Sequence, residues 1–451
     1  MTGFWRSAAC GLVILCGGLS ARVDRVQAAD ALRVGAATVE MQAEDEMVIG
    51  GGIGPGRLTG QEGKLQATAL VVAGDTRLCL VAVDVLMINR DYLDPAAKRI
   101  EEECGIPFEN ILINSSHTHH APSTVTIHGY QREEEFCRRT VEAIVAAAKE
   151  ANARAEASVE CQPVYRLGQE ATVGQNSRLL LNDGFVFWIG PRENALRPTG
   201  PFDVDLPVLA FRKPDGGYAG LLFNHSTHCI GTRQPKRSPG FYGLAAQELS
   251  EELEAPCAFF SGAAGSTHNL ILTTDEMVLR LKGAIHDSLQ AAQPMSSTRL
   301  AAVKREFTYR VREFDEETEE RKCVDYCQKY APQGAEYIAQ VFRDMREILR
   351  PQQGQERSTW LQALRIGDAY FVAVPAEYFT VLGIEIKRRS PHRNTFVFGL
   401  SNDYIGYVPN RDAYDLGGYQ TWTGLHSFVE RGTGEAIVDE CVRMLEEVGR
   451  E

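Results

Sequence analysis

The sequence predicts an α/β fold in which mixed β-sheets are layered with helices in a single large domain. Three observations support this expectation. The chain has 451 residues, of which 44% are hydrophobic and 24% charged, so it can bury a sizeable core. Short β-branched runs alternate with amphipathic helical patterns along most of its length. We find no repeat of 20–50 residues and no segment that resembles a domain linker, which favours one domain over residues 30–451.

The first 29 residues are expected to be a signal peptide. Arg6 precedes an apolar run at residues 8–19, and small residues follow, with cleavage expected after Ala28 or Ala29. The run is shorter than the roughly 20 residues that span a bilayer, so we expect no transmembrane segment and export to the periplasm or the extracellular space. The net charge of −13 disfavours nucleic acids and anionic membranes as partners.

The first half of the mature chain predicts strands that lead into a polar cluster. The apolar runs at residues 67–73 and 77–86 are separated by the turn 74–76, which is typical of a hairpin. A helical pattern at 92–104, a short strand at 110–114 and an amphipathic helix at 136–153 follow. The polar cluster comes directly after the strand at 110–114.

The second half continues the alternation of strands and helices. We expect hairpins at residues 179–188, 208–224 and 360–374, a strand at 257–260, and helices at 244–254, 275–292 and 434–449. Residues 311–350 are rich in charge at helical spacing and predict a solvated helical insertion, to which we assign no catalytic residue.

Histidines in the polar cluster are the first candidate site. His117 and His119 lie two apart at a strand end, where alternate residues face the same side. Imidazole nitrogen is a preferred zinc ligand. A polar loop of hydrogen-bonded histidines is the alternative, but three histidines within four residues favour metal binding or catalysis.

Three further stretches supply polar groups after apolar runs. The first holds His225 and His228, either of which is a possible second metal ligand. Glu377 follows the strand at 371–374 and completes a His/His/Glu set, although a Glu after Pro also begins many helices. The third is a glycine-punctuated stretch with Tyr404, Tyr407, Tyr414 and Tyr419, which suits either aromatic packing or hydrogen bonding to an oxyanion.

Five motifs, taken in order, resemble the N-terminal catalytic domain of the neutral/alkaline (non-lysosomal) ceramidase family. The similarity extends from about residue 33 to 430, and its motifs are NSSHTHHAP at 114–122, NHSTHC at 224–229, FFSGAAGS at 259–266, VAVPAEYF at 372–379 and SNDYIGYVP at 401–409. The resemblance implies a Zn²⁺ ion with the ligands His117, His228, Glu377 and Tyr407. It also implies that His119, Arg178 and Tyr419 are catalytic, with His119 as a proton shuttle to the leaving amine and Tyr419 and Arg178 as hydrogen-bond donors to the oxyanion. Alignment of NHSTHC with the corresponding family motif favours His228 over His225 as the ligand. The family's two tyrosines lie twelve residues apart, and that spacing selects Tyr407 and Tyr419.

One motif departs from the family pattern. The family's Gly-Asp-x-Ser-Pro-Asn run, which supplies an active-site serine, is replaced by Gly-Ser-Thr-His-Asn-Leu at residues 265–270, with His268 at the serine position. The sequence therefore predicts an exported zinc-dependent hydrolase that cleaves an amide bond in an N-acylated lipid such as ceramide. An esterase or deacylase acting on another acyl substrate, and an inactive exported binding protein, are the alternatives.

Overall fold

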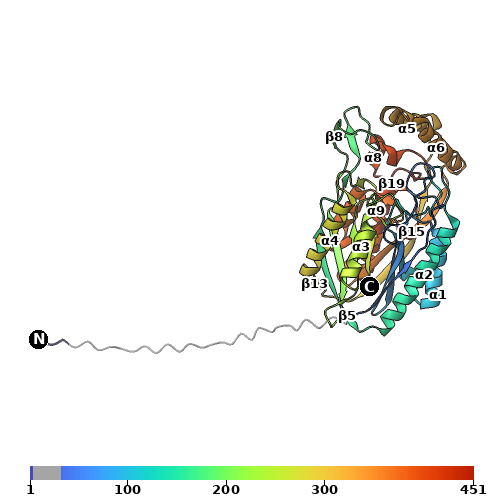
Figure 1. Ribbon diagram of the computed structural model, residues 1–451. Helices are drawn as coiled ribbons and strands as arrows, with labels where there is room; N and C mark the ends of the chain where they lie inside the picture. Colours follow the sequence, from blue (N-terminus) through green and yellow to red (C-terminus); the bar gives the residue numbers. More distant parts are fainter. Residues whose placement is uncertain (4–31, 451) are drawn as a thin grey trace.

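The computed structural model describes residues 1–3 and 32–450. The predicted signal peptide lies outside the described residues, apart from its first three. The fold is mixed α/β, as predicted, with two main sheets packed face to face and helices on their outer sides (Figure 1). Among the described residues, no helix is both long and apolar enough to cross a membrane.

The larger sheet has nine strands, in the order β11-β10-β9-β5-β1-β2-β3-β4, with β13 paired to β5. Its hairpins β2–β3 and β9–β10 confirm two of the sequence predictions. Two pairs at its ends, β3–β4 and β10–β11, are parallel. The strands are β1 (Leu32–Glu40), β2 (Gln66–Ala73), β3 (Arg77–Val83), β4 (Ile111–Ser115), β5 (Glu160–Gln169), β9 (Asp205–Arg212), β10 (Tyr218–His225), β11 (Cys257–Ser261) and β13 (Gln293–Pro294).

The smaller sheet has the order β14-β15-β16-β18, built from β14 (Leu300–Arg310), β15 (Glu356–Ile366), β16 (Ala369–Ala373) and β18 (Thr395–Phe398). The hairpin β15–β16 confirms a third prediction. An apolar layer joins the two sheets: Leu70 and Phe260 of the larger sheet belong to one cluster with Ile366, Phe371 and Phe398 of the smaller one.

Helices cover both outer faces. Apolar clusters join α1 and α2 to one half of the larger sheet, and α3 and α4 to the other half. Helices α7 and α9 pack on the smaller sheet. These helices are α1 (Arg90–Cys104), α2 (Glu134–Ala157), α3 (Gly240–Glu252), α4 (Thr274–Ala291), α7 (Thr380–Arg389) and α9 (Thr433–Arg450). The predicted helices all form. α1, α2, α3 and α9 are slightly longer than their sequence patterns suggested, and α4 has the expected length, shifted by one residue.

The predicted hairpin at 179–188 forms, but it is short. The Gly184 N–H donates to the Leu181 carbonyl at the turn, the Leu181 N–H to the Phe185 carbonyl and the Phe187 N–H to the Leu179 carbonyl, with an antiparallel bridge between Leu180 and Val186. β7 (Leu179–Leu181) also pairs with β8 (Ala195–Pro198). After this short ladder, the Trp188 N–H donates to the Tyr326 hydroxyl at 2.8 Å.

The charged segment at 311–350 forms two helices, α5 (Glu316–Tyr330) and α6 (Ala335–Leu349), at the upper edge of the molecule (Figure 1). They are not a purely solvated insertion, because each carries an apolar stripe. Cys323, Tyr326 and Phe342 are fully buried in the largest core cluster. The charges that suggested a solvated surface lie mainly on the opposite faces, where Arg343 and Glu336 form an ion pair.

Several short segments converge where strands of the two sheets end. β4 ends at Ser115 and β10 at His225, and a bridge between Thr118 and Cys229 joins the loops that follow. Two short parallel strands, β17 (Glu377–Tyr378) and β19 (Tyr407–Val408), place Glu377 opposite Tyr407. The remaining short elements nearby are β6 (Gln175–Asn176), β12 (Thr267–His268) and α8 (Arg411–Leu416).

Candidate metal centre and substrate cavity

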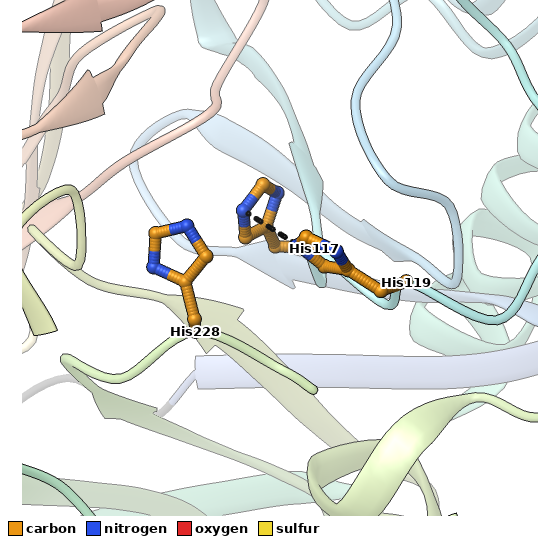
Figure 2. A group of neighbouring side chains, drawn as sticks. All are labelled: His117, His119 and His228. Carbon is orange, nitrogen blue, oxygen red and sulfur yellow. Dashed lines mark hydrogen bonds between the residues drawn. The ribbon is translucent and has the colours of Figure 1, made fainter. Parts of the chain in front are cut away.

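Three imidazole rings meet between the two bridged loops. The ring centroid of His117 lies 4.8 Å from that of His119 and 4.5 Å from that of His228 (Figure 2). Strand alternation does not explain this approach, because β4 ends before His117, whose φ of 63° is left-handed. Such a backbone costs of order 1–3 kcal/mol in a non-glycine residue, and observed outliers of this kind concentrate at functional sites.

The three rings share one tautomer. In each, Nδ1 lies 2.8–3.1 Å from a backbone carbonyl oxygen: Leu86 for His117, Gly51 for His119 and Ala264 for His228. A carbonyl oxygen only accepts hydrogen bonds, so each Nδ1 carries the proton and each Nε2 keeps a lone pair. The Nε2 atoms of His117 and His119 are 3.4 Å apart, and no proton is available to join them.

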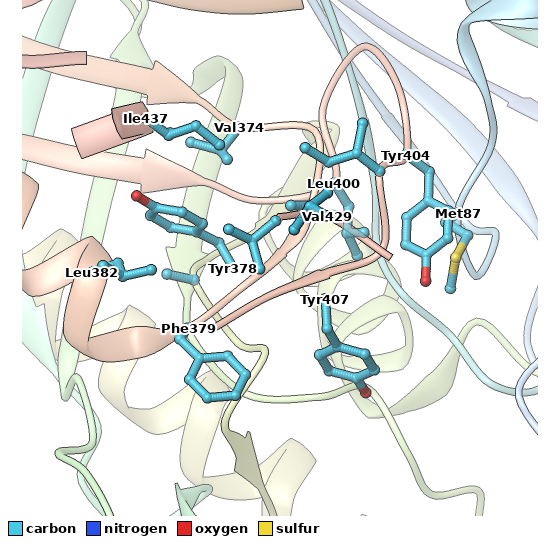
Figure 3. Packing of buried hydrophobic residues seen from close by; sticks show 14 of the residues in the cluster. Met87, Val374, Tyr378, Phe379, Leu382, Leu400, Tyr404, Tyr407, Val429 and Ile437 are labelled. Atoms are coloured by element: carbon cyan, nitrogen blue, oxygen red, sulfur yellow. The ribbon is translucent and has the colours of Figure 1, made fainter. Parts of the chain in front are cut away.

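A carboxylate and a phenol complete the set of donor atoms. The Oε2 atom of Glu377 lies 3.3 Å from His117 Nε2 and 3.0 Å from His228 Nε2, which is also 3.0 Å from the Tyr407 hydroxyl. The Tyr404 hydroxyl donates to the other carboxylate oxygen at 2.9 Å and leaves Oε2 to face the rings. Figure 3 shows Tyr404 and Tyr407 at the edge of the apolar cluster, with their hydroxyl groups pointing away from Leu400 and Val429.

Burial and mutual charge set the protonation of these groups. Burial alone would raise the pKa of Glu377, but His117 and His228 beside it hold that pKa well below its usual range. Burial and the neighbouring His117 lower the pKa of His228. Burial, with Glu377 nearby, raises the pKa of Tyr407 well above 10. Glu377 is thus a carboxylate, and the His228 ring beside it is neutral.

This donor set fits a metal ion. The nitrogens of His117, His119 and His228 all lie within 4.8 Å of one another. Tetrahedral zinc bonds of about 2.0–2.1 Å place neighbouring donors about 3.3 Å apart, close to the 3.0–3.3 Å that separate Glu377 Oε2 and the Tyr407 hydroxyl from the rings. Converging lone pairs without protons repel one another, and a cation at their meeting point removes that repulsion.

The two histidines of the second loop have different surroundings. Both nitrogens of His225 are engaged away from the centre, since Nδ1 lies 2.5 Å from the Tyr242 hydroxyl and Nε2 lies 2.9 Å from the Glu170 carbonyl. His228 anchors Nδ1 only and turns Nε2 toward Glu377. The structure therefore brings His228, and not His225, to the other predicted ligands.

An apolar cavity of about 540 Å³ opens onto the centre. Its floor is polar and includes His119, His268, Tyr407, Tyr419 and Gln420. Its walls are mostly apolar and include Ile53, Phe187, Trp188, Ile189, Ile230, Leu270, Tyr337 and Ile338. Tyr337 and Ile338 belong to α6, so the charged segment at 311–350 contributes to the cavity wall.

Tyr419 and Arg178, the two predicted donors to the oxyanion, occupy different positions. Tyr419 lines the cavity, stacks on Trp188 with ring centroids 4.5 Å apart, and has its hydroxyl 3.0 Å from His128 Nε2. Arg178 is not among the residues that line the cavity. Its guanidinium is buried, donates to the Gln420 side chain, and is one layer removed from the floor.

The altered motif at 265–270 places no hydroxyl in the cavity. Ser266 is hydrogen bonded to Thr380, and Thr267 donates to the Ser226 carbonyl at 2.7 Å. His268 lines the cavity and stacks on the His228 ring at 4.0 Å. Gly265 is required here, because a Cβ would lie 2.2 Å from the Glu377 carbonyl oxygen.

Sequence reasoning missed several residues that support the site. Tyr404 was named in the tyrosine stretch but not as the residue that holds Glu377, and His128, which holds Tyr419, carried no local signal. Gly51 did carry a local signal, because it belongs to the glycine run at 50–56. A Cβ on Gly51 would lie 2.4 Å from His119 Nδ1, so glycine lets this loop pass close to His119. The glycine content alone could have suggested such a close approach.

Comparison with known proteins gives a fold relationship. No protein-family model and no curated protein sequence matches the chain. Among solved structures, it is similar to the crystal structure of neutral ceramidase from Pseudomonas aeruginosa, with a TM-score of 0.71 and 18% identity over 93% of this chain and 75% of that one. A structure of a ceramidase complexed with C2 gives a TM-score of 0.69 at 18% identity, over 92% and 75% of the two chains. The chain thus has the fold of neutral ceramidase.

Proposed function

We propose that this chain is an exported zinc-dependent hydrolase that cleaves the amide bond of an N-acylated lipid such as ceramide. The observation that carries the proposal is the apolar cavity that ends on the metal-donor cluster. Apolar walls suit an aliphatic chain, and the polar floor brings a cleavable bond to the donors. The fold shared with neutral ceramidase supports the same substrate class.

In this proposal, His117, His228, Glu377 and Tyr407 hold the zinc ion. When bound, the ion supplies a Lewis acid and a water molecule whose pKa is lowered to about 7. Leu86 and Ala264 hold the Nδ1 protons of the two histidine ligands, and Tyr404 holds the carboxylate, so each donor is oriented before a substrate arrives.

His119 and Tyr419 would handle the proton and the developing charge. The Gly51 carbonyl fixes the His119 tautomer, so its Nε2 can accept a proton from water and return it to the leaving amine. The Tyr419 hydroxyl can accept a hydrogen bond from His128 and donate its own proton to the acyl oxygen. Removing one such donor typically costs about 3–4 kcal/mol of transition-state stabilisation.

Purified protein incubated with N-hexanoylsphingosine tests the proposal. We expect release of hexanoate and sphingosine, loss of activity with a chelator and recovery with zinc. Hydrolysis of simple acyl esters without hydrolysis of the amide would instead establish an esterase. Intact, metal-loaded protein that cleaves neither substrate would contradict a hydrolase of either kind.

A further inference from the structure

Arg178 and Gln420 form a buried pair directly behind the cavity floor. The Arg178 side chain is 1% exposed; its Nη1 donates to Gln420 Oε1 at 2.7 Å and its Nη2 to the Gly417 carbonyl at 2.6 Å. Gln420 itself lines the cavity beside Tyr419. The pair therefore connects a fixed positive charge to the space that a substrate would fill.

The chemistry of this pair fixes the orientation of the amide. A guanidinium group has donors only, so the amide atom that faces Arg178 must be the oxygen. The NH₂ group of Gln420 then points away from Arg178. Among the described residues, Gln420 Nε2 makes no hydrogen bond. It is also absent from the fully buried polar atoms that lack a partner, so it keeps accessible surface, and Gln420 lines the cavity.

The charge of Arg178 has no acidic partner among the described residues. Its side chain makes no ion pair with a carboxylate there, and the ring of Phe379 lies 5.1 Å from the guanidinium carbon. Burial lowers the pKa of Arg178 to about 10. An uncompensated buried cation is costly, and such groups are usually kept where negative charge develops.

We propose that Gln420 donates a hydrogen bond from Nε2 to the carbonyl oxygen of the acyl substrate, and that Arg178 is a positioning residue that acts through Gln420. This inference rests on the proposed function, because the acyl oxygen is the acceptor. Arg178 orients the side-chain amide of Gln420 and polarises it, which strengthens Gln420 Nε2 as a hydrogen-bond donor. Together with Tyr419, Gln420 provides two neighbouring donors at the polar floor of the cavity.

A double-mutant cycle separates this role from direct contact by Arg178. We expect Gln420→Met and Arg178→Met each to lower kcat/KM by about 100- to 1000-fold, with the double variant no worse than Gln420→Met. Gln420→Glu should lose as much, since a carboxylate pairs with Arg178 but offers no donor. The matched control is Arg192→Met, because Arg192 also supports a cavity residue, through the Leu270 carbonyl. Its effect should add to that of Gln420→Met.

A binding measurement without turnover provides the second readout. Trp188 lines the cavity, so its fluorescence reports occupancy in the metal-free protein. We expect wild type to bind N-hexanoylsphingosine about tenfold more tightly than its thioamide analogue, whose sulfur is a poor acceptor. The preference should disappear in both single variants if they remain folded.

Two results would overturn the inference while the proposed function stands. They are additive losses of kcat/KM in the Arg178/Gln420 cycle, and an oxygen-over-sulfur preference that survives in Gln420→Met. Wild-type protein that neither binds nor hydrolyses the amide would overturn the proposed function, and this inference with it.

Discussion

The two histidine-bearing loops have similar sequences but different roles for their histidines. The first follows β4 and holds His117, His119 and His120; the second begins at His225, the last residue of β10, and continues to His228. In the first loop, both His117 and His119 turn Nε2 toward the centre. In the second loop, His228 turns Nε2 toward the centre, whereas both ring nitrogens of His225 are hydrogen bonded, one to the Tyr242 hydroxyl and one to the Glu170 carbonyl. A histidine is available to a metal only when its surroundings occupy one nitrogen and leave the other free.

The largest effect should follow from removing a metal ligand of either loop. His117→Ala and His228→Ala each delete a donor whose partners cannot replace it, so activity toward the amide should fall by more than the about 1000-fold cost of one oxyanion donor. Amide hydrolysis at fixed zinc concentration measures this. Comparable turnover in either variant would show that the loop does not supply a ligand.

A smaller effect is expected for His119 of the first loop. His119→Asn should lower kcat by about 100- to 10,000-fold, the range for general acid–base groups, while bound zinc stays near the wild-type amount. Kinetics and metal analysis of the same preparation test both parts. If zinc is lost with His119, this residue is a ligand, as the 4.8 Å grouping of the three histidines also allows.

The other histidine of the second loop should matter for stability alone. His225→Phe leaves the Tyr242 hydroxyl and the Glu170 carbonyl without their buried partner, so the free energy of unfolding should fall by about 1–3 kcal/mol. Urea unfolding near pH 7.5 measures this. An equal loss of zinc in this variant would contradict the distinction between the loops.

The same variant gives a pH-dependent test with a defined sign. Burial lowers the pKa of His225 from 6.5, so below pH 6.5 the unfolded chain binds a proton there that the folded chain excludes. The contribution of neutral His225 is therefore complete above pH 6.5 and is lost as the pH falls. The stability difference between wild type and His225→Phe should shrink by up to about 1.4 kcal/mol per pH unit below 6.5. A difference that grows on acidification would contradict the neutral, buried state.

Much of the fold could be predicted from local patterns. The hairpins β2–β3, β9–β10 and β15–β16 and the amphipathic helices carried clear periodicity. The hairpin expected at 179–188 also forms, whereas the pairing of β7 with β8 and the contact of Trp188 with Tyr326 of α5 are not encoded by a local pattern. In the sequence, charged residues surround the apolar positions of α5 and α6, so the apolar stripes of these helices were not predicted.

The site was predictable where a motif marks a strand end. The residues His117, His119, His228, Glu377, Tyr407 and Tyr419 were named from the motifs, and the structure brings them together around one point and one cavity. The residues that orient them were not predictable, because Tyr404, His128 and Gln420 act through contacts set by packing. The resemblance implied a catalytic role for Arg178, and its guanidinium lies behind Gln420 and does not line the cavity.

The zinc content of three purified proteins tests the central claim most directly. Wild type and His225→Phe should each retain about one zinc ion per chain, and His228→Ala should retain almost none. A His228→Ala protein that keeps its zinc while His225→Phe loses it would contradict the metal centre described here, as would wild-type protein that binds no zinc at all.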